Sequence, residues 1–193
     1  LGSAGLAFLY SGDMIAFIVT IICSLIGYFG RTLSVRFGCN EYVGIALGGF
    51  AAMVSAYGFY SHIEQASLVY VLVCCTLFMI PGVPLINAVI DTINNHILSG
   101  ITRAIRTILI VGSMTLGMAM ALYFSPMPAF SFVDIKPHVL SIEQIIGAFT
   151  AAASFAVLFN APVRLLVSIG IGGILCVFIR NLLAVEFGFS IPG

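Results

Sequence analysis

The chain has 193 residues, of which 61% are hydrophobic and 7% charged, and its mean hydropathy is +1.20. A water-soluble domain carries about 25% charged residues, so this composition excludes a globule that faces water on all sides. Seven basic and seven acidic side chains give zero net charge, which argues against a nucleic-acid partner and a polybasic surface arm.

In chain order, the apolar runs predict an all-α fold, a polytopic transmembrane bundle of about six spans. The runs are long and unalternated, as is typical of helices rather than barrel strands. Leu1–Tyr10 is expected to be the end of a helix, and Ser11–Asp13 a turn. The spans expected after it are Met14–Phe29, Tyr42–Tyr60, Ser67–Ile80, Ile105–Tyr123, Ile142–Leu158 and Leu165–Ile179.

A proline-containing stretch divides the chain into two parts. We expect a first membrane half over residues 1–124, an extracytoplasmic linker over 125–141, and the start of a second half over 142–193. Both ends of the sequence look cut, so we expect a fragment that another part of the protein, or a separate chain, completes. On Tyr42–Tyr60, small residues recur every four positions and favour close helix packing within the chain over a homo-oligomer seam. These residues are Gly44, Gly48, Ala52 and Ala56.

The basic residues predict the orientation of the chain in the membrane. One side collects five arginines against Lys136 and Arg180 on the other. Since basic residues concentrate on the cytoplasmic side, we expect the arginine-rich stretches 31–41, 88–106 and 159–164 to be cytoplasmic loops of an inner-membrane protein. The five arginines are Arg31, Arg36, Arg103, Arg106 and Arg164.

An internal repeat is visible when the chain is shifted by 150 residues. The segment 31–38 then falls on 181–188, and Leu33, Val35, Phe37 and Gly38 coincide with identical residues. An odd number of spans separates the copies, so they would run in opposite directions through the membrane. This pattern predicts an inverted-repeat transporter, although apolar helices also match by chance.

The stretch with the clearest functional signal is Pro81–Gly100. Two prolines and a glycine within four residues interrupt a helix, and lipid tolerates a break only where protein or water satisfies the backbone. Free carbonyls and amides at such a break suit the two charges of an amino acid. On one continuous helix, a polar face would follow the break, and Asp91 on it could bind an ammonium group or carry a proton. That face comprises Asn87, Asp91, Asn94, Asn95 and Thr102.

Two interpretations of this stretch remain open. In the first, it lines the path of a small polar substrate, with Pro81, Gly82 and Pro84 forming the break. In the second, residues 85–100 form an amphipathic helix on the cytoplasmic surface of a non-transporting membrane subunit or scaffold. Arg103 would lie beside the exit of the substrate path or, more simply, anchor the chain at the lipid headgroups. Asn160, before Pro162, repeats the polar-plus-proline theme.

The sequence shows no motif of an enzyme, a metal site or a cofactor site. It contains no HExxH, P-loop or dinucleotide fingerprint, and its five cysteines lack metal-ligand spacing. We therefore expect no catalysis and no cofactor.

Residues 81–103 resemble the bacterial threonine/serine exporter family. The similarity rests on Pro81-Gly-Val-Pro-Leu-Ile-Asn-Ala, the following Asp91, and the Gly-Ile-Thr-Arg that ends at Arg103. Phe155–Arg164 is similar to the opening of that family's second membrane half. The resemblance implies proton-driven export of small hydroxy amino acids by two five-helix halves. It carries over Pro81, Gly82, Pro84, Asn87, Asp91 and Arg103 as motif positions.

Overall fold

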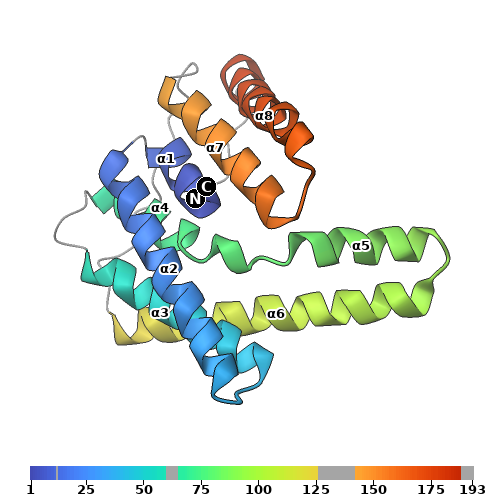
Figure 1. The fold of residues 1–193 in the computed structure, drawn as a ribbon. Coiled ribbons are helices and arrows are strands. Elements are labelled where there is room, and N and C mark those ends of the chain that lie inside the picture. The colour runs from blue at the N-terminus through green and yellow to red at the C-terminus, as the bar shows by residue number, and fades with distance from the viewer. Residues whose placement is uncertain (12, 60–64, 126–141, 188–193) are drawn as a thin grey trace.

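A computed structural model describes residues 1–11, 13–59, 65–125 and 142–187 (Figure 1). Within these ranges the chain forms helices and no strand, which confirms the all-α prediction. The α-helices are α1 (Gly2–Ser11), α2 (Met14–Arg36), α3 (Glu41–Gly58), α4 (Gln65–Cys74), α5 (Gly82–Ile93), α6 (Ile97–Phe124), α7 (Ile142–Leu158) and α8 (Leu166–Phe187). Two short 3-10 helices complete them, η2 (Leu77–Met79) and η3 (Val163–Leu165).

Three helical segments are long and apolar enough to cross a membrane: Met14–Arg36, Ile97–Phe124 and Val163–Leu183. A fourth candidate span is the pair Leu68–Met79 and Gly82–Ile93, which bends by 53° at its break. The helix α7 is apolar but has only 17 residues. The protein is therefore a helical membrane protein with three to four candidate spans in the described ranges, and the count of six stays a prediction. The predicted linker lies almost wholly outside the described residues.

The helix α2 is two turns longer than the sequence predicted. Asp13 begins it by accepting a hydrogen bond from the Ile15 N–H at 2.9 Å, and Gly38 ends it with a φ of +85°. Nothing between Phe29 and Arg36 breaks a helix, so Arg31 and Arg36 belong to the span and not to a loop.

Small residues let α2 and α3 approach closely. A Cβ on Gly27 would lie 2.9 Å from the Gly48 carbonyl oxygen, and a Cβ on Gly48 would lie 2.8 Å from the Gly27 carbonyl oxygen. Ala52 and Ala56 are fully buried on the same stripe. The small-residue stripe thus packs within the chain, as predicted.

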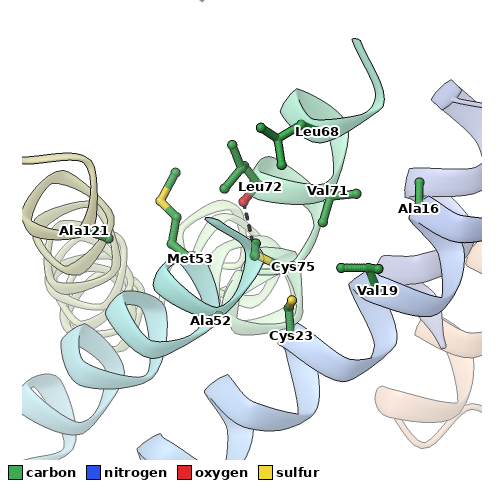
Figure 2. Packing of buried hydrophobic residues seen from close by; sticks show 11 residues of the cluster. Ala16, Val19, Cys23, Ala52, Met53, Leu68, Val71, Leu72, Cys75 and Ala121 are labelled. Atoms are coloured by element: carbon green, nitrogen blue, oxygen red, sulfur yellow. Dashed lines mark hydrogen bonds between the residues drawn. The ribbon is translucent and has the colours of Figure 1, made fainter. Parts of the chain in front are cut away.

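The main core lies where α2, α3 and α4 meet (Figure 2). Cys23 of α2 lies beside Cys75, which directly follows α4, and Val71 of α4 points toward Val19, while Leu72 lies on the side of Met53 of α3 (Figure 2). All are buried, and the Cys75 thiol donates to the Leu72 carbonyl at 3.2 Å. This core fixes the end of α4, and hence the starting point of the break.

A second group of helices joins the two predicted halves. The helix α1 packs along α7, and α7 packs along α8 (Figure 1). A Cβ on Gly5 would lie 2.7 Å from the Ala151 nitrogen, and a Cβ on Gly147 would lie 2.8 Å from Leu9 Cα. Because these pairs follow opposite order along the two helices, α1 and α7 are antiparallel.

We predict that Gly27→Ala destabilises the protein by about 1–3 kcal/mol, the usual cost of overpacking. The added methyl would lie 2.8 Å from Ala52 Cβ and 2.9 Å from a backbone oxygen, so the helices must separate. Thermal unfolding in detergent, followed by far-UV circular dichroism, measures the effect. The matched control is Gly112→Ala, because a Cβ there has no atom within 4 Å. Equal melting temperatures for the two variants would contradict this packing.

Candidate functional site

The break between α4 and α5 is a compact backbone turn. After α4, the 3-10 helix Leu77–Met79 leads into Pro81, which is buried and has φ −82° and ψ 60°. These angles are those of an inverse γ-turn, which the 2.9 Å hydrogen bond from Gly82 N–H to the Ile80 carbonyl closes. The chain restarts as α5 directly after this turn.

Hydrogen bonds within the turn pair the carbonyls that the prolines would have left without donors. In a continuous helix, Pro81 and Pro84 would face the carbonyls of Leu77 and Ile80 but have no N–H to give. The Leu77 carbonyl instead accepts from Ile80 N–H at 3.1 Å, and the Ile80 carbonyl accepts from Gly82 N–H. The expectation that the break exposes these carbonyls is therefore wrong for both. In a continuous helix, Gly82 N–H would donate to the Phe78 carbonyl. Because it donates to Ile80 instead, the Phe78 carbonyl loses its helical donor.

The break lies beside the C-terminal end of α7. A Cβ on Gly82 would be 4.0 Å from Phe159 Cζ, the nearest heavy atom. Phe159 precedes Asn160, so the structure brings two of the predicted site segments into one neighbourhood. Pro84 and Asn87, in the first half of α5, are half-buried.

Asp91 is held between α5 and α6. The two helices form an antiparallel hairpin that extends away from the other helices (Figure 1). Asp91 Oδ2 accepts a hydrogen bond from Ser99 Oγ at 2.7 Å and forms an ion pair with Arg103 Nε at 3.3 Å. The Asp91 side chain is 21% exposed and that of Arg103 47%. Gly100 permits this contact, because a Cβ there would lie 2.9 Å from the Ala88 carbonyl oxygen.

Of the other predicted members of the polar face, Asn87 shares α5 with Asp91, but Asn94, Asn95 and Thr102 do not. The helix α5 ends at Ile93, Asn94 and Asn95 form an exposed turn, and Thr102 belongs to α6. The single polar face was therefore a wrong prediction, and so was a loop over 88–106, which is mostly helical. The reason is Asn95, whose φ of 62° is left-handed, a conformation that asparagine tolerates better than most residues.

Asn95 and Asn160 have the same structural role. His96 N–H donates to the Asp91 carbonyl and Asn95 N–H to the Thr92 carbonyl, the two bonds of a Schellman motif. Asn160 has a φ of 55° and ends α7 in the same way, through bonds from Ala161 and Asn160 to Ala156 and Val157. Both side chains thus occur where a helix must reverse.

One polar cluster was missed by the sequence analysis, which placed Arg180 on the external side at the end of a span. Arg180 lies within α8, where its guanidinium stands 5.5 Å from the centre of the Tyr10 ring and donates to Asn181 Oδ1 at 3.1 Å. Asn181, 4% exposed, donates to Gln144 Oε1 at 3.0 Å. The cluster joins α1, α7 and α8, and no local spacing could have revealed it.

The described residues contain no group of three or more His, Cys, Asp or Glu that could hold a metal ion. What they do contain is a bent, proline-broken candidate span followed by a charge-paired carboxylate. These features define a helical membrane protein whose broken span carries an ionised pair.

Comparison with known families then identifies the family of the chain. Residues 1–125 match the family model ThrE, described as "Putative threonine/serine exporter". The chain belongs to this exporter family, and the match includes the break, Asp91 and Arg103. No curated protein and no solved structure matches the chain.

We predict that Asn95→Val loosens the hairpin and that Asn95→Gly does not. A β-branched residue pays about 1–2 kcal/mol in the left-handed region, equivalent to about a 5–30-fold change in an opening equilibrium. Hydrogen exchange of the His96 amide, which donates to the Asp91 carbonyl at 2.8 Å, reports the opening. If Asn95→Gly abolished transport while protecting this amide, Asn95 would contact substrate and the structural role would be insufficient.

Proposed function

We propose that the protein exports small hydroxy amino acids, such as threonine and serine, across the bacterial inner membrane and that protons drive this export. Membership in the exporter family supports the substrate class. The observation that carries the mechanism is the Asp91–Arg103 ion pair next to the broken span. The arginine-rich ends of α2 and α6 would face the cytoplasm.

The ion pair is suited to a zwitterion. An amino acid carries an ammonium and a carboxylate on one carbon, and a carboxylate–guanidinium pair offers the complementary charges. In this proposal the substrate enters between them, its ammonium binding Asp91 and its carboxylate binding Arg103. Ser99, which donates to Asp91, would hold the carboxylate in place. Asn87, one turn before Asp91 on α5, would supply neutral hydrogen bonds to the hydroxyl group.

Proton coupling would act on the same pair. A proton on Asp91 removes its negative charge and with it the attraction to Arg103, so the α5–α6 hairpin could open. The break at Pro81 and Gly82 would serve as its hinge, since the segments Leu68–Met79 and Gly82–Ile93 meet there at 53°. Substrate and proton would thus compete for one carboxylate, which links their movements.

An inverted repeat would place this path between two related halves. The antiparallel contact of α1 with α7 supports it, because an axis in the membrane plane relates helices that run in opposite directions. The helix pair α7–α8 would then begin a second half whose remaining helices another part of the protein, or a partner chain, supplies.

One observation favours the alternative of a non-transporting scaffold. Beyond the break, α5 packs chiefly on α6, and most of its large apolar side chains remain exposed. The most exposed are Ile86 at 59% and Ile93 at 74%. Such a hairpin could lie on the membrane surface, with the Asp91–Arg103 pair only holding it closed.

We predict that Asp91→Asn lowers proton-driven threonine transport by about ten- to hundredfold, since a hydrogen bond to a charged group contributes about 1.5–3 kcal/mol. The asparagine can still accept from Ser99 but cannot pair with Arg103 or release a proton. Transport of labelled threonine in proteoliposomes under an imposed proton gradient measures the loss.

The matched control is Asp13→Asn, because asparagine caps a helix as well as aspartate does and Asp13 caps α2. This control should transport at the normal rate. If Asp91→Asn also did so and still responded to the proton gradient, the coupling mechanism would be refuted, whereas the absence of threonine transport by the wild type would favour the scaffold function.

A further inference from the structure

A hollow of about 500 Å³ opens at the C-terminal end of α2, where this helix meets the first turn of α3. It shares no residue with the break or with the Asp91 site. Its lining consists of Tyr28, Arg31, Thr32, Val35, Arg36 and Glu41. The two arginines and the tyrosine give it hydrogen-bond donors, and α2 places it at the end of a candidate membrane span.

The charges around the hollow do not cancel. Glu41 accepts Arg31 on one oxygen at 3.5 Å and Arg106 of α6 on the other at 3.1 Å. Arg36 is exposed and forms no ion pair with the described residues. Three guanidiniums against one carboxylate leave two positive charges, and the N-terminus of α3 adds a partial one. An anion is the complementary ligand.

An apolar strip leads from the hollow along the span. Ile18, Leu25 and Thr32 are seven residues apart, so they lie on one face of α2. Ile18 and Leu25 are 52% and 50% exposed, and Tyr28 is 52% exposed between them and the arginines. Along this face the side chains are first apolar, then phenolic, then cationic. This order complements a phospholipid, whose acyl chain is followed by ester oxygens and then by an anionic phosphate.

We propose that the hollow binds an anionic phospholipid, with its phosphate at Arg31 and Arg36 and an acyl chain along Ile18 and Leu25. The Tyr28 hydroxyl lies at the depth of the ester and phosphate oxygens. Thr32 already donates to the Tyr28 carbonyl at 2.9 Å, so its hydroxyl is left to accept. A soluble phosphate or carboxylate could use the arginines but not the apolar strip, which favours a lipid.

Lipid retention in native mass spectrometry tests this site. The full protein, solubilised in neutral detergent, is titrated with phosphatidylglycerol and with phosphatidylcholine of the same chain length. The wild type should retain phosphatidylglycerol preferentially. Arg36→Gln should weaken that retention about fivefold, the usual contribution of one basic residue near an anionic surface. Arg164→Gln removes an arginine outside the hollow and serves as the matched control.

A second pair of measurements separates the possible ligands. Leu25→Ser should weaken phosphatidylglycerol retention without changing any charge, and inorganic phosphate at equal concentration should not displace the lipid. Equal retention of both lipids by the wild type, or equal losses in Arg36→Gln and Arg164→Gln, would overturn the proposal. Displacement by inorganic phosphate, together with an inert Leu25→Ser, would show a soluble-anion site and refute the lipid assignment.

Discussion

The arrangement of this protein depends on how it satisfies the backbone where Pro81 and Pro84 remove two donors. In lipid, an unpaired carbonyl costs several kcal/mol, so a break survives only if nearby donors replace those lost. Ile80 and Gly82 supply them within the turn itself, while the buried core around Cys23 and Cys75 fixes the end of α4. The two carbonyls that the prolines cannot serve are thus paired within the turn, and α5 leaves the bundle as one arm of a hairpin (Figure 1).

The hairpin beyond this bend brings two opposite charges together. Asn95 reverses the chain, Gly100 lets α6 approach α5, and the charges of Asp91 and Arg103 then meet. Each of these contacts depends on the one before it. A second charge group, Arg31 and Arg106 on Glu41, ties α6 to the ends of α2 and α3 nearer the bundle. The Asp91 pair consequently lies on the part of the hairpin that is least restrained.

The sequence predicted the helical class and the break, because composition and proline chemistry act locally, and it singled out Asp91 and Arg103, whose role in transport stays a proposal. It did not predict that Asp91 pairs with Arg103. This contact depends on a reversal of the chain at Asn95, whereas the helical periodicity assumed for the sequence runs through that position without interruption. A single asparagine in a left-handed conformation was enough to turn one expected polar face into two helices. Likewise, the close contacts of α1 with α7 come from glycines far apart in the chain, and apolar periodicity carries no information about such partners.

We propose that Asp91 acts in transport through its charge at its own position and not merely as a clamp for the hairpin. The direct test exchanges the two charges in the double variant Asp91→Arg with Arg103→Asp, compared with each single variant. Proton-driven threonine transport is measured beside hydrogen exchange of the His96 amide. The account predicts that the exchanged pair restores protection of this amide while transport stays lost, because the substrate's two charges would meet the wrong partners. Recovery of transport together with protection would contradict it.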